Sequence, residues 1–222
     1  MQSIIEGIAR FHKEDAPIVQ PILHHLAMNG QSPQAMMITC ADSRVMPEEL
    51  TRSNPGDLFM VRNIGNLVPR PEDAVVGTDV SVGAAVDYGV DVLHIRNLVV
   101  MGHSGCGAMK ALLDWQGQRD NIGNWLRNGR LALSRLSSDL LKNEELNECD
   151  RLSQINVLAS LDNLSHYVNV RRGVENGQIE LHGWWLDIAN AQVRAYSRRT
   201  QRFETLEVAY APGISSSAFS LR

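Results

Sequence analysis

The 222-residue sequence predicts an α/β fold with a mainly parallel central β-sheet flanked by helices. The prediction rests on short, continuously apolar segments, typical of strands buried on both faces, that alternate with segments of helical periodicity. Helical segments also precede the first predicted strand, and strand-like segments joined by short turns follow the last predicted helix. The sequence therefore predicts an N-terminal helical arm and a C-terminal extension of antiparallel strands.

The predicted elements follow one another along the chain. Apolar residues at helical spacing indicate arm helices at 4–11 and 19–26. We expect strands at 35–40, 58–63 and 98–101, and helices at 81–93 and 106–115. Residues 122–169 are expected to be helical, with a polar interruption at 142–150. Further strands are expected at 179–188, 192–196 and 203–210.

The length fits one domain with one sizeable core. We expect that domain to comprise a helical arm (1–30), a core that carries the chemistry (31–210) and a loosely held, Ser-rich tail (211–222). The arm precedes every element on which it could pack. Its apolar face therefore covers either the domain's own surface or a partner subunit.

Composition excludes several classes of function. The formal net charge is −4 and no basic stripe is present, so we expect no nucleic-acid binding. No segment has the roughly 20 apolar residues that span a bilayer, and Glu6 stands where a signal peptide would be positive. An odd count of three cysteines argues against a disulfide framework. We expect a protein of the cytoplasm or of a bacterial microcompartment, with cysteines used as ligands, nucleophiles or inert core.

Metal-ligand residue types stand at the ends of two predicted strands. Cys40 ends the first, and His103 and Cys106 follow the third. The carboxyl ends of parallel strands meet at one edge of a sheet, so these side chains converge if the strands are neighbours. Two thiolates and an imidazole suit Zn²⁺, and three protein ligands leave a coordination position open, as in catalytic sites. Each residue alone is more often core, whereas the set predicts zinc. Cys149 has no such context.

Asp42 and Arg44 lie immediately after Cys40. A guanidinium beside a carboxylate lowers its pKa and can hold it through two hydrogen bonds. A carboxylate held in this way can accept a hydrogen bond from metal-bound water, or it can reach the metal itself. The simpler alternative is a local salt bridge in a turn.

Cys40-Ala41-Asp42-Ser43-Arg44 and the later Gly102-His103-Ser104-Gly105-Cys106-Gly107 together resemble the paired signature of the β-class carbonic anhydrases. The resemblance extends over most of the chain, through segments 31–33, 55–59, 62–66 and 182–184. It implies a carbonate dehydratase, a lyase that interconverts carbon dioxide and bicarbonate with release of a proton. The implied zinc ligands are Cys40, His103 and Cys106, and the implied catalytic residues are Asp42 and Arg44.

The resemblance also suggests substrate-binding groups. Gln31 would donate to an oxygen of carbon dioxide or bicarbonate, and the backbone from Gly102 to Gly107 would let small reactants approach closely. In this family the site lies at a dimer interface. We therefore expect a homodimer, or a multiple of dimers, in which Gln31 can serve the neighbouring subunit's zinc.

Other functions fit parts of the pattern. A hydrolase acting on carbonyl sulfide or carbon disulfide would use the same metal chemistry on the same scaffold. A non-catalytic zinc or redox-sensing module would need only Cys40 and Cys106, which could form a disulfide on loss of the metal. A structural domain with a vacant site is a further alternative. Asp42, Arg44 and Gln31 argue against the sensor, which has no use for them.

Overall fold

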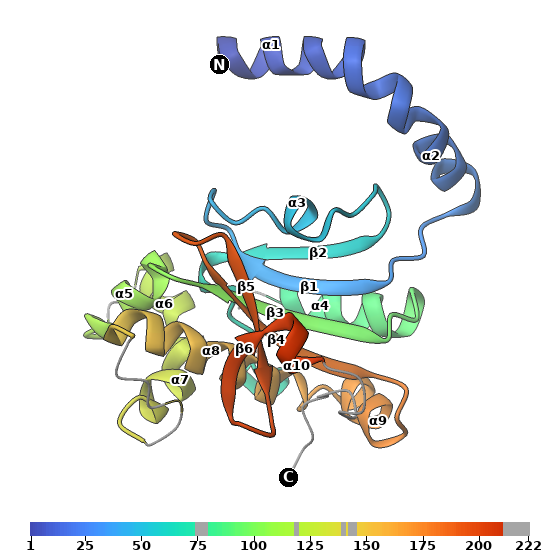
Figure 1. Ribbon diagram of the computed structural model, residues 1–222. Helices are drawn as coiled ribbons and strands as arrows, with labels where there is room; N and C mark the ends of the chain where they lie inside the picture. Colours follow the sequence, from blue (N-terminus) through green and yellow to red (C-terminus); the bar gives the residue numbers. More distant parts are fainter. Residues whose placement is uncertain (74–79, 118–119, 139–140, 142–145, 211–222) are drawn as a thin grey trace.

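A six-stranded sheet forms the centre of the molecule (Figure 1). The computed structural model describes residues 1–73, 80–117, 120–138, 141 and 146–210, so the predicted tail at 211–222 lies outside the described residues. The strand order is β2-β1-β3-β4-β5-β6. The strands are β1 (Ala35–Cys40), β2 (Leu58–Asn63), β3 (Asn97–His103), β4 (Glu180–Asp187), β5 (Gln192–Ser197) and β6 (Arg202–Thr205). Strands β2, β1, β3 and β4 pair in parallel, and β5 and β6 extend the sheet antiparallel. The predicted fold class is confirmed.

The strand predictions for 35–40 and 58–63 are correct residue for residue. The third strand is longer than its apolar run, because β3 continues through Gly102 to His103. The prediction of a strand over 203–210 is wrong after Thr205, where helix α10 (Leu206–Ala209) begins. This turn of helix brings the Tyr210 hydroxyl within 3.0 Å of His182 Nδ1 and 2.9 Å of Trp184 Nε1 on β4.

Helices cover one face of the sheet. They are α4 (Ser81–Asp87), α5 (Gly107–Leu113), α6 (Asn121–Leu126), α7 (Arg130–Arg135), α8 (Glu148–Leu164) and α9 (Val168–Glu175), while the short α3 (Pro47–Thr51) follows β1. A π-helical turn, Tyr88–Val92, continues α4 to almost the predicted end. The region expected to be helical is divided into separate helices, and Val168 begins α9 rather than ending α8. Neither α3 nor α9 was predicted from the sequence.

The main core lies between the sheet and these helices. Met36, Ile38, Leu98 and Val100 of β1 and β3 are completely buried there, together with apolar residues of α8 such as Ile155. On the opposite face the buried cluster is much smaller and consists of Met37, Val45, Val99, Met101 and Leu186. Leu58, Met60 and Trp184 are only partly buried at its margin. One face of the sheet is thus fully packed, and the other is thinly covered.

The N-terminal arm consists of α1 (Gln2–Arg10), a π-helical turn (Phe11–Asp15) and α2 (Ala16–Asn29). It arches away from the sheet (Figure 1), and none of its residues is buried. The apolar side chains of its first part, Ile4, Ile5, Ile8 and Phe11, are between 42% and 60% exposed. The apolar face of the arm therefore does not cover the surface of its own domain, which was the first of the two alternatives. In the described part of the chain, no helix is both long and apolar enough to cross a membrane.

Candidate metal centre

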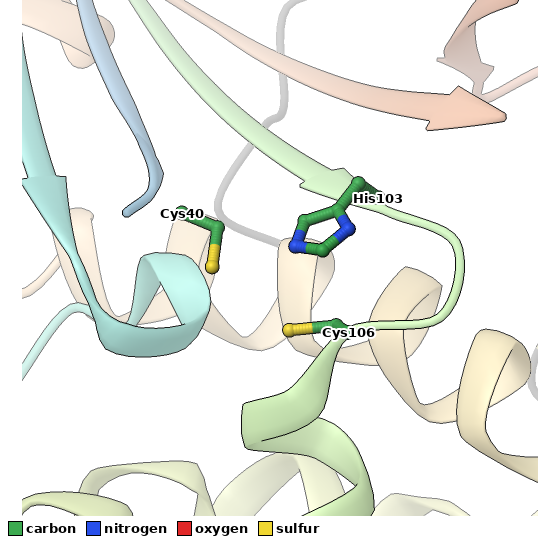
Figure 2. Close-up of side chains that lie close together, drawn as sticks. All are labelled: Cys40, His103 and Cys106. Atoms are coloured by element: carbon green, nitrogen blue, oxygen red, sulfur yellow. The ribbon is translucent and has the colours of Figure 1, made fainter. Parts of the chain in front are cut away.

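Cys40, His103 and Cys106 converge at the carboxyl edge of the parallel strands (Figure 2). Cys40 is the last residue of β1, His103 is the last residue of the adjacent strand β3, and Cys106 caps the N-terminus of α5. Their ligand atoms all lie within 4.8 Å of one another, and all three residues are buried. The convergence predicted from the strand ends is confirmed, because β1 and β3 are neighbours.

The turn between His103 and Cys106 is fixed from two sides. Gly105 has a φ of +60°, a left-handed conformation that favours glycine, and it turns the chain back toward the site. Its N–H donates to Asp150 Oδ1 of α8 at 2.6 Å, and its carbonyl accepts from Arg44 Nη2 at 3.2 Å. Both ligands that flank Gly105 are therefore held in a defined geometry.

The three donor groups fit zinc. His103 Nδ1 donates to the Ser104 carbonyl at 2.9 Å, which leaves the lone pair of Nε2 facing the two sulfurs. Nε2 is buried and, among the described residues, has no partner with ordinary hydrogen-bond geometry. Zn–S bonds of about 2.3 Å in a tetrahedral site separate ligand atoms by about 3.8 Å. This separation is compatible with ligand atoms that all lie within 4.8 Å of one another. A soft cation would satisfy both the orphaned nitrogen and the buried thiols.

The two thiols differ strongly in acidity. The Cys106 thiol, which interacts with Cys40, lowers the pKa of Cys40 to about 4 despite the opposing effect of burial. The same interaction, together with burial, raises the pKa of Cys106. The Gly65 N–H also points at Cys40 Sγ from 3.4 Å and stabilises its thiolate. These contacts favour the thiolate form of Cys40, which is the form of cysteine that binds a metal.

Asp42 borders this cluster and is held by Arg44. Arg44 Nε donates to Oδ1 at 2.9 Å, Nη2 donates to Oδ2 at 2.8 Å, and the Arg44 backbone N–H donates to Oδ1 at 3.0 Å. These hydrogen bonds hold the pKa of Asp42 well below its usual range. Asp42 Oδ2 lies 3.9 Å from His103 Nε2, so the fixed carboxylate is adjacent to the place where a metal would bind.

Residues 35–193, well over half of the chain, match the model of the carbonic anhydrase family. Solved β-carbonic anhydrases share the fold over almost the whole chain. The chain belongs to the β-carbonic anhydrase family. It is 37% identical to a carbonic anhydrase of Pseudomonas aeruginosa, over 93% of this chain and 92% of that one. It superimposes on the β-carbonic anhydrase CcaA with a TM-score of 0.83 and 31% identity, covering 92% and 91% of the two chains. A tetrameric β-carbonic anhydrase of Sordaria macrospora superimposes with a TM-score of 0.73 and 25% identity, over 87% of this chain and 95% of that one.

Gln31 lies far from this carbonic anhydrase site in its own chain. It is exposed and precedes the amino end of β1, whereas Cys40 ends the same strand. A strand rises about 3.3 Å per residue, so Ala35 and Cys40 are about 16 Å apart. Gln31 thus lies before the amino end of the strand whose carboxyl end carries Cys40. Its role in substrate binding, in its own subunit or in a neighbouring one, stays a prediction.

The two glycines predicted to bind substrate have different environments. A Cβ on Gly102 would lie 2.8 Å from Val157 Cγ2 and 3.1 Å from Ser153 Oγ, so α8 occupies the space beside it. The absence of a side chain at Gly102 therefore permits close strand–helix packing, and this geometry gives no support to an approach of substrate there. Gly107, at the start of α5, has open space around its Cα, and its role stays a prediction.

Arg62 was given no role from the sequence, although segment 62–66 contributed to the family resemblance. Its guanidinium donates to the carbonyls of Cys40, Asp42 and Val45 at 2.9–3.2 Å. Arg62 thus fixes the loop that carries the first ligand and Asp42. A charged residue inside an otherwise apolar strand was the available signal.

Cys149 is half-buried, and its thiol contacts the Cys106 carbonyl at 3.5 Å.

Proposed function

We propose that this protein hydrates carbon dioxide reversibly to bicarbonate and a proton, at a zinc ion held by Cys40, His103 and Cys106. One observation carries the proposal: two buried thiols meet a buried imidazole nitrogen that accepts no hydrogen bond from, and donates none to, the described residues, beside a carboxylate that an arginine fixes. A structural or sensing zinc site has no need of that carboxylate. Membership of the carbonic anhydrase family supports the same reaction.

Zinc, when bound, lowers the pKa of water toward neutrality and so supplies a nucleophile. Asp42 accepts a hydrogen bond from the attacking water, which orients the oxygen lone pair toward carbon dioxide. Arg44 keeps the carboxylate in that position by holding both oxygens. If this hold were lost, Asp42 could swing the short distance to the metal and close the site.

We propose that a second copy of the chain completes the site. Gln31 would donate to an oxygen of carbon dioxide or bicarbonate held at the partner's metal; its place before the amino end of β1, whose carboxyl end carries Cys40, supports this. Residues 1–30 act as an arm across the partner, and residues 31–210 form the catalytic core. The exposed apolar face of α1 and the thinly covered face of the sheet support a dimer or a multiple of dimers. The tetrameric relative is consistent with this assembly.

We place the enzyme in the cytoplasm. The three cysteines are free thiols, which fits a reducing compartment. In that environment a donor set with two thiolates stays reduced and able to bind metal.

The proposal is tested by measuring metal content and substrate turnover on the same preparation. Elemental analysis should find about one zinc per chain, and stopped-flow assays should show carbon dioxide hydration. His103→Ala should lose both. A protein that holds zinc but hydrolyses carbonyl sulfide or carbon disulfide without hydrating carbon dioxide would instead be the alternative hydrolase. Zinc without turnover of any of these substrates would favour a sensor.

A further inference from the structure

A row of polar side chains lies on the buried side of α8. Each donates a hydrogen bond to a backbone carbonyl of another segment, and consecutive members are three or four residues apart, on one helix face. The bonds run from Ser153 to His103 (2.8 Å), Asn156 to Gly65 (2.9 Å), Ser160 to Asn66 (3.2 Å) and Asn163 to Val68 (2.7 Å). Buried polar groups that are all paired in this way define a unique geometry. The row thus fixes His103 and the segment that follows β2.

The segment after β2 contributes a backbone N–H donor to the Cys40 sulfur. It is the tight turn Ile64–Asn66, the blue-green turn beside Cys40 in Figure 2. The Gly65 N–H donates to Cys40 Sγ at 3.4 Å. The φ of Gly65 is +80°, and a Cβ there would lie 2.8 Å from Ala108 Cβ on α5. Glycine is therefore required for the turn to fit between Cys40 and the helix that Cys106 caps.

Two side chains hold the peptide groups on either side of Gly65. The Gly65 N–H shares its peptide plane with the Ile64 carbonyl, which accepts a hydrogen bond from Trp125 Nε1 at 2.7 Å. The next peptide group presents the Gly65 carbonyl to Asn156 Nδ2 at 2.9 Å. Because a peptide group is planar, a donor on the Ile64 oxygen also fixes the direction of the Gly65 N–H.

We propose that Trp125 and Asn156 are positioning residues for the Cys40 ligand. Trp125 on α6 and Asn156 on α8 hold the turn by hydrogen bonds, and so direct the Gly65 N–H toward the sulfur. A hydrogen bond to a metal-bound thiolate withdraws electron density from sulfur and fixes its orientation, as groups outside the ligand set do in other metal sites. The inference rests on the proposed zinc site and adds residues that do not touch the metal or the substrate.

The decisive variant is Trp125→Phe, which keeps an aromatic ring and removes the N–H donor. Trp184→Phe is its matched control, because Trp184 lies on β4, away from the turn, and the substitution removes an indole hydrogen bond to the Tyr210 hydroxyl. Asn156→Ala has a matching control in Asn163→Ala, which loses the same kind of bond further along α8. Trp125→Phe carries the test alone if Asn156→Ala does not fold.

Two measurements distinguish positioning from general stability. Competition with a chelator gives the Zn²⁺ affinity, and the absorption of the Co²⁺-substituted protein gives the energy of the thiolate-to-metal charge-transfer band. Trp125→Phe and Asn156→Ala should lower zinc affinity about tenfold. They should also move the Co²⁺ band to longer wavelength, because a thiolate without its hydrogen bond gives up an electron more readily. The controls should match wild type in both.

The inference is overturned if Trp125→Phe has the zinc affinity and the Co²⁺ band of Trp184→Phe. Failure of wild type to bind either metal would instead refute the proposed zinc site. The two failures are therefore distinguishable in one set of experiments.

Discussion

Replacing Gly102 by alanine tests whether this glycine serves packing or substrate. The added methyl group would lie 2.8 Å from Val157 Cγ2, 3.1 Å from Ser153 Oγ and 3.3 Å from the Ser153 carbonyl oxygen. One of these neighbours is backbone, so the methyl group cannot be accommodated by a change of rotamer alone. Strand β3 and helix α8 must move apart. Overpacking of this kind costs about 1–3 kcal/mol of the free energy of unfolding.

Through Ser153, the substitution Gly102→Ala should also affect the metal centre. Its hydroxyl donates to the His103 carbonyl, so displacement of Ser153 disturbs a ligand as well as the core. Gly183→Ala is the control, because a methyl group there meets Val157 and Leu161 of the same helix at 3.1 Å but lies on β4. Both variants should lower the free energy of unfolding in urea, and only Gly102→Ala should also weaken zinc binding.

Substrate kinetics provide the refutation. If Gly102 served the approach of carbon dioxide, Gly102→Ala would keep wild-type stability and zinc affinity while its KM rose. That result would show that the contacts with α8 are not what the glycine is for.

Other perturbations test the dyad, the assembly and a second histidine. Asp42→Ala should retain zinc, because the three ligands remain, and lose activity about 100-fold, since the fixed hydrogen-bond acceptor is gone. Arg44→Ala should also lower turnover, and wild-type rates in either variant would exclude the dyad from the mechanism. The double variant Ile5→Ser/Ile8→Ser should shift the oligomer toward monomer in light scattering without loss of helix, and an unchanged oligomer would exclude the arm. Burial lowers the pKa of His182, so the folded state disfavours the protonated ring, and stability should fall as the pH decreases from about 6.5 toward the folded-state pKa. In His182→Gln, urea midpoints at pH 7.5 and 5.5 should differ less than in wild type, and an equal difference would assign the pH dependence to other groups.

The positions of the first strands along the chain could be predicted from local patterns. The convergence of the ligands was predicted on the condition that their strands are neighbours, which the sheet order meets. Continuous apolar runs located β1 and β2 to the residue, and the parallel pairing of β1 with β3 places Cys40 and His103 at the same edge. The errors lie where tertiary contacts override the pattern. Residues 206–209 are apolar enough for a strand, but the contacts of Tyr210 with β4 favour a helical turn. Such contacts have no local signature.

The groups that hold the site could not be predicted for a related reason. Asn156 and Ser153 look like ordinary polar positions of a helix, and their partners are 91 and 50 residues away in the sequence. Arg62 has the same character, since its guanidinium binds the carbonyls of a loop about 20 residues earlier. Metal ligands can be recognised in a sequence by residue type and spacing. The residues that hydrogen-bond to the ligand-bearing segments can be recognised only once the fold shows which segments are in contact.

The position of Gln31 links assembly to catalysis. Measuring the zinc content of a dissociated subunit distinguishes loss of the substrate-binding group from loss of the metal site. The ligands, the dyad and the groups that support them all belong to one chain, and each is fixed by contacts within that chain. A dissociated subunit should therefore bind zinc as tightly as the assembled enzyme. Gln31 precedes the amino end of β1, whereas Cys40 is at its carboxyl end, and we propose that a second copy brings this side chain to the substrate. Dissociation through Ile5→Ser/Ile8→Ser should thus lower turnover at unchanged zinc content. Loss of zinc in parallel with dissociation would mean that the partner supports the metal site itself.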